Sequence, residues 1–292
     1  MFLGKGGVGK TTCAAATAVQ IADAGKSALA ISTDPTPSLS HIFGLEGGRR
    51  ERQVLPRLFI TELGLAEVRA MWDERFGREV YAVFSSFVDI DYPTFVQFVT
   101  SLLPGLNEEF MVDYIRRLST AARYQHILWD TAPLGQTLAL LAMPTLLAEH
   151  LRIAPRIYSQ LRASVERKET VMQVIRGWQQ LAAACLEFLR RDVRFSMVTI
   201  PEALAVAQLD SVIGELQRHG LSLHRLIVNN VVQLADSAFL TRKAEQQRPH
   251  LERLRQRYGS LPLVEIPLFS EEPRGIEQLR TVGRLLWPAP AP

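Results

Sequence analysis

Cysteines and long apolar runs are both scarce in this sequence of 292 residues. Cys13 and Cys185 stand far apart, so the chain alone supplies neither a disulfide framework nor a four-ligand structural zinc site. No apolar run reaches the roughly 18 residues that a transmembrane helix needs, and the longest, residues 137–148, contains Pro144. We therefore expect no membrane-spanning helix and no structural zinc. No signal peptide is recognisable, so we expect a cytoplasmic protein, with peripheral contact to a membrane left open.

The excess of positive charge is also small. The formal net charge is +3 and the isoelectric point is about 9.0. Because chains that bind nucleic acids usually carry clustered basic stripes, we expect no nucleic acid partner. One segment, residues 242–257, is locally basic. We interpret it as the solvated face of a helix, with a partner site as the alternative.

Patterns of buried strands alternate with helical patterns along much of the chain. A strand stub at residues 1–3 precedes an Ala-rich helical segment, residues 11–24. This alternation is typical of an α/β fold with a doubly wound, mainly parallel sheet, in which ligands bind at the carboxyl ends of the strands. Further strands, most of them followed by a polar residue or a proline, are expected at residues 27–32, 125–129, 194–200, 223–228 and 263–266.

Two segments depart from the alternation. Residues 66–123 and 151–190 show helical spacing with many large apolar side chains, among them Trp72, Phe110 and Trp178. We expect these segments to form a helical subdomain inserted into one domain that spans residues 1–292. Their aromatic and methionine content is compatible with an adaptable apolar groove, and ordinary core packing is the alternative.

A phosphate-binding motif lies near the start of the chain. Residues 4–12 read Gly-Lys-Gly-Gly-Val-Gly-Lys-Thr-Thr and fit the pattern G-x-x-x-x-G-K-[ST] between a strand and a helix. The glycines let backbone N–H groups face phosphates, and the helix N-terminus adds positive potential. Lys10 should reach the β- and γ-phosphates of ATP, and Thr11 should hold Mg²⁺, as in a P-loop NTPase. The expected nucleotide-binding residues of the loop are Gly4, Gly6, Gly7, Val8, Gly9, Lys10, Thr11 and Thr12.

Three further charged residues are candidates for the hydrolysis of ATP. Lys5 adds a second cation beside the phosphates and, with Lys10, can stabilise charge that develops during phosphoryl transfer. Asp34 follows the second strand and is the candidate for orienting the attacking water. Asp130 follows a later strand and is the Walker-B-like carboxylate expected to hold Mg²⁺. For either aspartate, capping of a helix or turn is the alternative role.

Several motifs together resemble one family, the arsenite-pump ATPases and the targeting factors for tail-anchored membrane proteins. The resemblance runs from Met1 to about Leu286, and the joint spacing of its motifs is far more specific than the phosphate loop alone. The motifs are residues 5–12, Ser32-Thr33-Asp34-Pro35 with Ser38-Leu39-Ser40, Asp130-Thr131-Ala132-Pro133 with Gly135 and Thr137, Ile227-Val228-Asn229, and Pro267-Leu268 with Glu272, Arg274 and Gly275.

The resemblance implies roles for particular residues. Asp34 would be the water-orienting residue of a first switch segment, and Asp130 would open a second one. Asn229 would contact adenine, with Pro267 packed nearby. In a homodimer, Lys5 would reach the nucleotide of the partner. These roles imply a homodimeric ATPase that uses ATP and Mg²⁺.

The resemblance also implies a role for the helical subdomain, including residues 103–106 and Glu108. This subdomain would rearrange with the nucleotide state, and in the targeting factors it lines an apolar groove for the transmembrane helix of a client. The expected partner is therefore an apolar client segment or a membrane protein.

Three departures from the family pattern bear on these expectations. Pro37 and Gln136 stand where the two switches usually carry histidine, which leaves the rate of hydrolysis and the switch coupling open. Residues 238–241 lack the cysteines with which targeting factors share zinc across a dimer. Cys13 and Cys185 do not supply the cysteine-rich metalloid site of the pumps.

Four functions remain open from the sequence. The first is an ATPase that couples its nucleotide state to the binding of a client, as in tail-anchored protein targeting. The alternative is the energising subunit of an arsenite or anion efflux pump. A partitioning ATPase with a membrane-binding terminal helix and a structural pseudo-ATPase are the other two. The apolar stripe of Ile276, Leu279, Val282 and Leu285 indicates instead that the terminal helix packs on the sheet.

Overall fold

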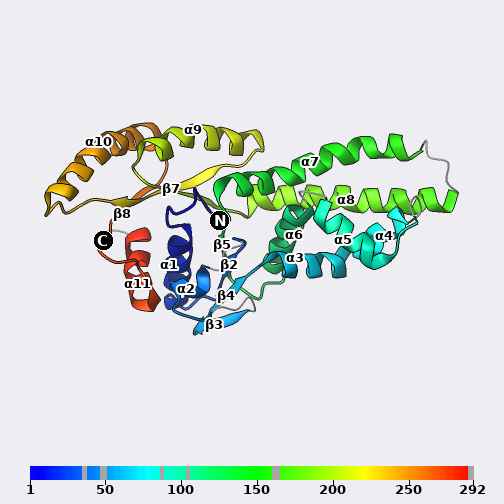
Figure 1. Ribbon diagram of the computed structural model, residues 1–292, viewed down its shortest axis with the longest axis horizontal. Coiled ribbons are helices and arrows are strands. Elements are labelled where there is room, and N and C mark those ends of the chain that lie inside the picture. The colour runs from blue at the N-terminus through cyan, green and yellow to red at the C-terminus, as the bar shows by residue number, and fades with distance from the viewer. Residues whose placement is uncertain (35–37, 47–50, 86–88, 103–105, 160–164, 289–292) are drawn as a thin grey trace. The chain divides into compact units, whose positions relative to one another are not determined.

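The computed structural model describes residues 1–34, 38–46, 51–85, 89–102, 106–159 and 165–288. The chain divides into two compact units (Figure 1). The first unit comprises Met1–Leu63, Ala121–Thr137 and Val193–Pro292, and the second comprises Gly64–Thr120 and Leu138–Asp192. Helix α7 (Leu134–Ser159) begins in the first unit and continues in the second.

The first unit is built on one sheet. In the part of the chain that the structure describes, this sheet has eight strands in the order β3-β4-β2-β5-β1-β6-β7-β8. Neighbouring strands are parallel, except for the antiparallel pair β3 and β4. Because β1 is central and later strands are added on both sides of it, the sheet is doubly wound, and the predicted α/β fold is confirmed. The strands are β1 (Phe2–Leu3), β2 (Ala28–Ser32), β3 (Arg52–Leu55), β4 (Leu58–Glu62), β5 (His126–Asp130), β6 (Phe195–Thr199), β7 (Leu223–Val231) and β8 (Leu263–Pro267).

Helices cover both faces of this sheet. Figure 1 shows α1 and α11 on one side of the strands, and α9 and α10 on the other. The central strands are therefore buried on both faces, which explains why β2 and β6 are continuous buried runs rather than alternating ones. The helices of this unit are α1 (Lys10–Asp23), α2 (Leu39–Ile42), α9 (Ala203–Arg218), α10 (Ala238–Tyr258) and α11 (Gly275–Leu286).

Helix α11 packs closely against α1, the helix that follows the phosphate loop. A β-carbon at Gly283 would lie 2.9 Å from the backbone oxygen of Ala16, so glycine permits the two backbones to approach. Just after α11, Trp287 Nε1 donates a hydrogen bond to Thr17 Oγ1 at 2.9 Å. The C-terminal helix therefore packs on α1 through buried residues of its apolar stripe such as Leu279 and Val282, whereas Leu285 of that stripe is exposed.

The sequence analysis missed the hairpin of β3 and β4. Its turn contains Arg57 in a left-handed conformation with φ of 68°. Strand β4 pairs in parallel with β2 in register from Ala28 with Leu58 to Ser32 with Glu62. This pairing places Glu62 beside the carboxyl end of β2, at the edge of the sheet where ligands bind in such folds.

The second unit is helical and has an aromatic core of its own. The ring of Phe76 meets Phe110 edge-on at 6.1 Å between centroids and lies 5.6 Å from Trp178. Trp72 and Phe95 are also buried. These described aromatic residues are core, whereas residues 103–105 and the side chains of Leu106 and Glu108 lie outside the described part. The helices are α3 (Leu65–Trp72), a π-helical turn (Asp73–Gly77), α4 (Arg78–Phe84), α5 (Tyr92–Leu102), α6 (Leu106–Thr120), α8 (Val165–Arg191) and most of α7. Among the described helices of both units, none combines the length and apolar content needed to cross a membrane.

Candidate nucleotide site

The loop between β1 and α1 has the backbone geometry of a phosphate cradle. Gly7 and Gly9 adopt left-handed conformations with φ of 76° and 94°. Gly9 is the N-cap of α1, and Lys10 begins the helix. Backbone N–H groups at the start of a helix have no partner within it, so they are available to an anion.

The backbone at Gly9 also lies very close to the side chain of Asn229. A β-carbon there would lie 2.3 Å from Asn229 Nδ2, whose amide donates a hydrogen bond to the Val8 backbone oxygen at 2.9 Å. We expect Gly9→Ala to lower the free energy of unfolding by about 1–3 kcal/mol, because alanine is strained at positive φ and displaces Asn229. Urea unfolding of the nucleotide-free protein measures the loss.

Gly6→Ala is the matched control for this prediction. A β-carbon at Gly6 meets no heavy atom within 4 Å, so its free energy of unfolding should change by no more than about 0.5 kcal/mol. Equal losses in the two variants would contradict the role assigned to Asn229 and Gly9.

Lys10 is held inside the loop. Its Nζ donates a hydrogen bond to the backbone oxygen of Lys5 at 3.0 Å, and the residue is 6% exposed. Burial lowers the pKa of the Lys10 ammonium, and the charges of Asp130 and Asp34 act in the opposite direction. The loop thus places one buried cation, next to two carboxylates, where a phosphate could bind.

Asp130 joins the phosphate loop to the end of β2. Its Oδ2 accepts hydrogen bonds from Thr11 Oγ1 at 2.9 Å and from Ser32 Oγ at 3.2 Å. Its Oδ1 is buried and has no hydrogen-bond partner among the described residues. Burial raises the pKa of this carboxyl to about 6, although the hydrogen bond from Thr11 opposes the shift.

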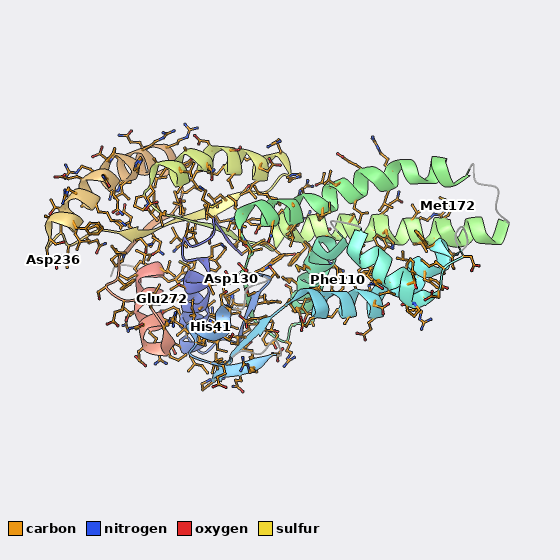
Figure 2. All side chains as sticks on the ribbon, in the orientation of Figure 1. His41, Phe110, Asp130, Met172, Asp236 and Glu272 are labelled. Atoms are coloured by element: carbon orange, nitrogen blue, oxygen red, sulfur yellow. The ribbon has the colours of Figure 1, made fainter. Side chains whose placement is uncertain are left out.

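These groups fit Mg²⁺ and a triphosphate. A buried carboxylate oxygen without a partner is unfavourable, and a cation next to it would satisfy it. Mg²⁺ prefers oxygen ligands, which Asp130 and Thr11 provide. Asp130 (labelled in Figure 2) lies close to the head of α1, because it accepts a hydrogen bond from Thr11 in the first turn of that helix.

The segment after β2 lies against the same cluster. The backbone N–H of Asp34 donates to Ser32 Oγ at 3.3 Å, and the Ser38 hydroxyl lies 3.4 Å from Thr11 Oγ1. Between them, Pro37 lies outside the described residues. The structure therefore brings both ends of this segment to Thr11 and Asp130.

Glu62 is a site-supporting residue that the sequence analysis missed. It is buried, its Oε1 accepts from the backbone N–H of Leu39 at 2.9 Å, and its Oε2 accepts from Ser40 Oγ at 2.8 Å. Glu62 thereby holds the start of α2, directly after Ser38. An acidic residue shortly after the apolar run 58–60 is the signal that could have identified it.

An open pocket of about 280 Å³ lies beside the loop, close to the lower end of the size range of ligand sites, about 300–1,000 Å³. Asn229 contributes to its wall, whereas Pro267 ends β8 and is not among the lining residues. Its neighbours in sequence supply the apolar surface instead. The lining includes Gly7, Thr12, Asn229, Ile266, Leu268 and Phe269.

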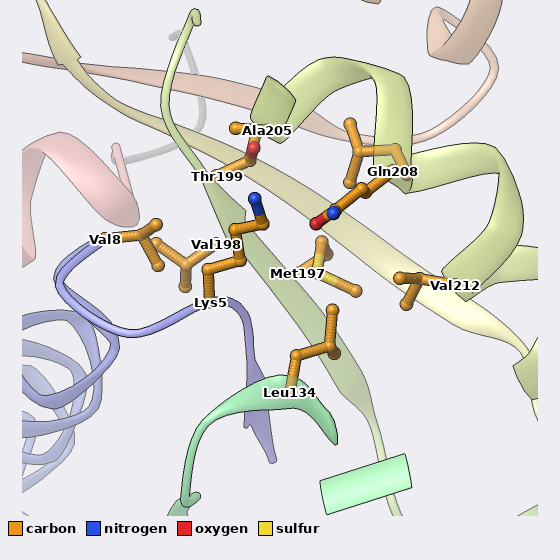
Figure 3. Close-up of a pocket in the computed structure, with 10 residues that line it drawn as sticks. Lys5, Val8, Leu134, Met197, Val198, Thr199, Ala205, Gln208 and Val212 are labelled. Atoms are coloured by element: carbon orange, nitrogen blue, oxygen red, sulfur yellow. The ribbon is translucent and has the colours of Figure 1, made fainter. Parts of the chain in front are cut away.

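Lys5 is directed away from the cradle. Figure 3 shows its amino group pointing toward Thr199, Ala205 and Gln208, where β6 ends and α9 begins. The backbone of Lys5 thus holds Lys10, while its side chain lies in a separate small pocket.

The second predicted switch begins at Asp130. Thr137 Oγ1 donates to the Ala132 backbone oxygen at 2.7 Å and so closes the turn that starts α7. Gln136, which replaces a family histidine, is exposed there.

The doubly wound sheet, the glycine loop at its central strand and the Thr11–Asp130 pair define a P-loop NTPase. The sequence profile of the anion-transporting ATPases matches residues 1–287. The chain therefore belongs to the anion-transporting ATPase family.

Individual relatives agree with this assignment. The chain is 31% identical to the ATPase ARSA1 of Chlamydomonas reinhardtii, over 97% of this chain and 42% of that protein. It is 27% identical to the ATPase GET3 of Podospora anserina and 28% identical to the ATPase get3 of Aspergillus terreus, over 97% of this chain and 88% of each relative. The chain thus spans less than half of the algal protein and most of the fungal ones. ATP hydrolysis is the activity that all these names share.

Proposed function

We propose that this protein is a Mg²⁺-dependent ATPase whose nucleotide state controls the binding of an apolar transmembrane segment of a client protein. The observation that carries the proposal is the hydrogen-bonding of Asp130, which joins Thr11 of the phosphate loop to Ser32. A cation and triphosphate at Thr11 would compete for these hydrogen bonds. The segments that follow Ser32 and Asp130 would then respond to the nucleotide.

In this proposal each residue of the site has a separate task. Lys10 and the loop amides bind the phosphates, while Thr11 and Asp130 hold Mg²⁺. Bound Mg²⁺ would neutralise phosphate charge. Asp34 orients water, and Asn229 lines the pocket that accepts adenine.

Helix α7 supports the coupling of the site to the helical unit. The segment from Asp130 leads within four residues to Leu134, where α7 begins, and the same helix runs to Ser159 in the second unit. A change in hydrogen bonding at Asp130 therefore acts close to the start of a continuous helix. We propose that residues of the helical unit bind the client in a nucleotide-dependent way.

The alternative, an efflux-pump subunit driven by metalloid, has less support. Cys13 and Cys185 are both buried, and burial raises the pKa of the Cys13 thiol to about 12. A thiol is a metal ligand only as thiolate, which this environment disfavours. The relatives named GET3 also fit the targeting function, because targeting factors of this family bind tail-anchored proteins.

We also propose a cytoplasmic homodimer in which Lys5 contacts the nucleotide of the partner subunit. The direction of the Lys5 amino group, toward Thr199, Ala205 and Gln208, supports this role. Lys5→Ala should then lower ATP turnover without weakening nucleotide binding, and turnover per chain in the wild type should rise with protein concentration.

A defined client tests the proposed function. The purified protein would be mixed with a fluorescent peptide carrying the transmembrane helix of a tail-anchored protein, with a non-hydrolysable ATP analogue, ADP or no nucleotide. We expect at least about tenfold tighter binding in one nucleotide state, which corresponds to a coupling free energy of about 1.4 kcal/mol. Lys10→Ala should remove this difference, because it removes the phosphate-binding cation.

Two outcomes would favour other functions. Equal affinity for the peptide in all three states would contradict the targeting function. Stimulation of hydrolysis by arsenite or antimonite, without peptide binding, would favour the pump.

A further inference from the structure

A polar side chain, Gln247, lies on the buried side of helix α10. The residue is 3% exposed, and it shares that side of the helix with Leu251, Leu254 and Tyr258. Burial of an amide next to apolar side chains is unfavourable unless the amide is hydrogen-bonded. The partners of Gln247 therefore indicate what an amide does at this position.

Both ends of the Gln247 amide bind the backbone where strand β7 ends. Its Nε2 donates a hydrogen bond to the Asn230 backbone oxygen, and its Oε1 accepts one from the Val232 backbone N–H, each at 2.9 Å. These two backbone groups are two residues apart in sequence. One planar side-chain amide thus fixes a short stretch of main chain, residues 230–232, at two points.

This stretch is an irregular part of β7. The pairing of β7 with β8 shifts its register between Val228 and Val231. Between them, Asn230 has a left-handed backbone conformation with φ of 59°. Irregularities of this kind, called β-bulges, redirect side chains and are common next to active sites. A left-handed conformation is uncommon for residues other than glycine and needs support from the surrounding structure, which the hydrogen bonds of Gln247 provide.

The bulge supplies two amide side chains to the pocket beside the phosphate loop. Asn229 and Asn230 both line this pocket. The Asn229 amide nitrogen also donates to the Val8 backbone oxygen, which fixes the orientation of the amide group. A side-chain amide can donate two hydrogen bonds and can accept through its oxygen. Asn229 can therefore still offer one donor and one acceptor to a ligand.

This pair of groups matches adenine better than guanine. Adenine presents an amino donor at N6 next to an acceptor at N7, and an asparagine amide can pair with both. Guanine presents two acceptors, O6 and N7, at the corresponding positions, so one of them would face the amide oxygen of asparagine. Discrimination between the two bases therefore requires that the Asn229 amide is held in one position and one orientation.

We propose that Gln247 is a positioning residue for base selection. Through the backbone of residues 230–232 it holds Asn229 in the position that accepts adenine and disfavours guanine. Gln247 is not among the lining residues of the pocket, so it acts through the bulge and not by contact with the base. This inference rests on the proposed binding of adenine in this pocket.

The nucleotide selectivity of Gln247→Leu tests the proposal. Leucine is similar in size but forms neither hydrogen bond. We expect the dissociation constant of ATP to rise about tenfold, within the discrimination that one bidentate base contact provides. The dissociation constant of GTP should change less than about twofold, because GTP does not use this contact. Turnover at saturating ATP should stay close to that of the wild type, since the phosphate and Mg²⁺ ligands are unchanged.

Two further variants separate positioning from general damage. Gln246→Leu makes the same change at the neighbouring, exposed position of α10 and should leave both dissociation constants as in the wild type. In an Asn229→Ala background, Gln247→Leu should cause no additional loss of selectivity, because two residues that act through one contact are not additive.

Circular dichroism shows whether Gln247→Leu is folded. Where it is not, Gln247→Glu replaces it, because this variant keeps the oxygen that accepts from Val232 but lacks the Nε2 donor to Asn230. The same loss of selectivity is expected.

Three results would overturn the proposal. Equal weakening of ATP and GTP binding would show general damage to the pocket. A full additional loss of selectivity in the Asn229→Ala background would show that Gln247 acts through another residue. Equal affinity of the wild type for ATP and GTP would show that the pocket does not select a base, and nucleotide-dependent binding of the client peptide would be unaffected by that result. Conversely, selectivity that depends on Gln247 without nucleotide-dependent peptide binding would support this inference and contradict the proposed targeting function.

Discussion

Asp34→Asn is expected to lower the ATP turnover number by about 10²–10⁴-fold, the contribution typical of a positioned acid or base. Asp34 stands at the carboxyl end of β2, and its backbone N–H donates to Ser32 Oγ, which in turn donates to Asp130. Its charge also interacts with Lys10 and Asp130. Its carboxylate is therefore close to the phosphate cradle, and asparagine would keep its shape but lose its negative charge and proton affinity.

Nucleotide affinity distinguishes this role from a simple binding role. Phosphate release under saturating ATP should fall, while the dissociation constant of a fluorescent ATP analogue should change less than about threefold, which is about 0.65 kcal/mol. Asp236→Asn, which removes a carboxylate from the exposed loop before α10, is the control and should leave both unchanged. Wild-type turnover in Asp34→Asn, or a loss of nucleotide binding equal to the loss of turnover, would show that Asp34 does not position water.

Local features of the nucleotide site could be predicted from the sequence, because the phosphate loop is one short segment. The motif dictates a turn, a helix start and a lysine in a fixed order within residues 4–12. Asp34 and Asp130 could also be placed near the loop, since parallel strands end at one edge of the sheet. The sheet order explains why they meet, because β2 and β5 are neighbours, with Ser32 opposite Asp130 in register.

Other contacts between segments that are far apart in the sequence could not be predicted. The carboxylate of Glu62 binds α2 only because β4 pairs with β2, and the periodicity of residues 58–62 alone does not reveal that pairing. Asn229 donates a hydrogen bond to Val8 across 221 positions of sequence, and the sequence analysis did not anticipate it. The family resemblance implied only a contact of Asn229 with adenine. The sequence likewise did not reveal whether apolar residues such as Trp72 and Phe110 face a core or a groove, because that depends on which residues pack against them.

The free energy of unfolding should depend on pH in a way that reflects the titration of Asp130. Burial raises the pKa of its carboxyl to about 6 in the folded protein, compared with about 3.9 in an unfolded chain. Between these values the folded state binds more protons than the unfolded state, so the free energy of unfolding falls as pH rises from about 4 to about 6. A difference of about two pKa units corresponds to about 3 kcal/mol. This destabilisation is fully present above pH 6 and absent below pH 4.

Asp130→Asn isolates this effect, because asparagine does not titrate. Both proteins would be unfolded with urea, without nucleotide and with EDTA. The free energy of unfolding of the wild type, relative to that of Asp130→Asn, should fall by about 3 kcal/mol between about pH 4 and pH 7. A difference that stays constant with pH would mean that the carboxyl is not held in an unfavourable environment. Mg²⁺ with an ATP analogue should restore part of the lost stability to the wild type alone, because the buried Oδ1 would then gain a cation. The site would thus lower the stability of the empty protein and favour occupancy by a metal-bound nucleotide.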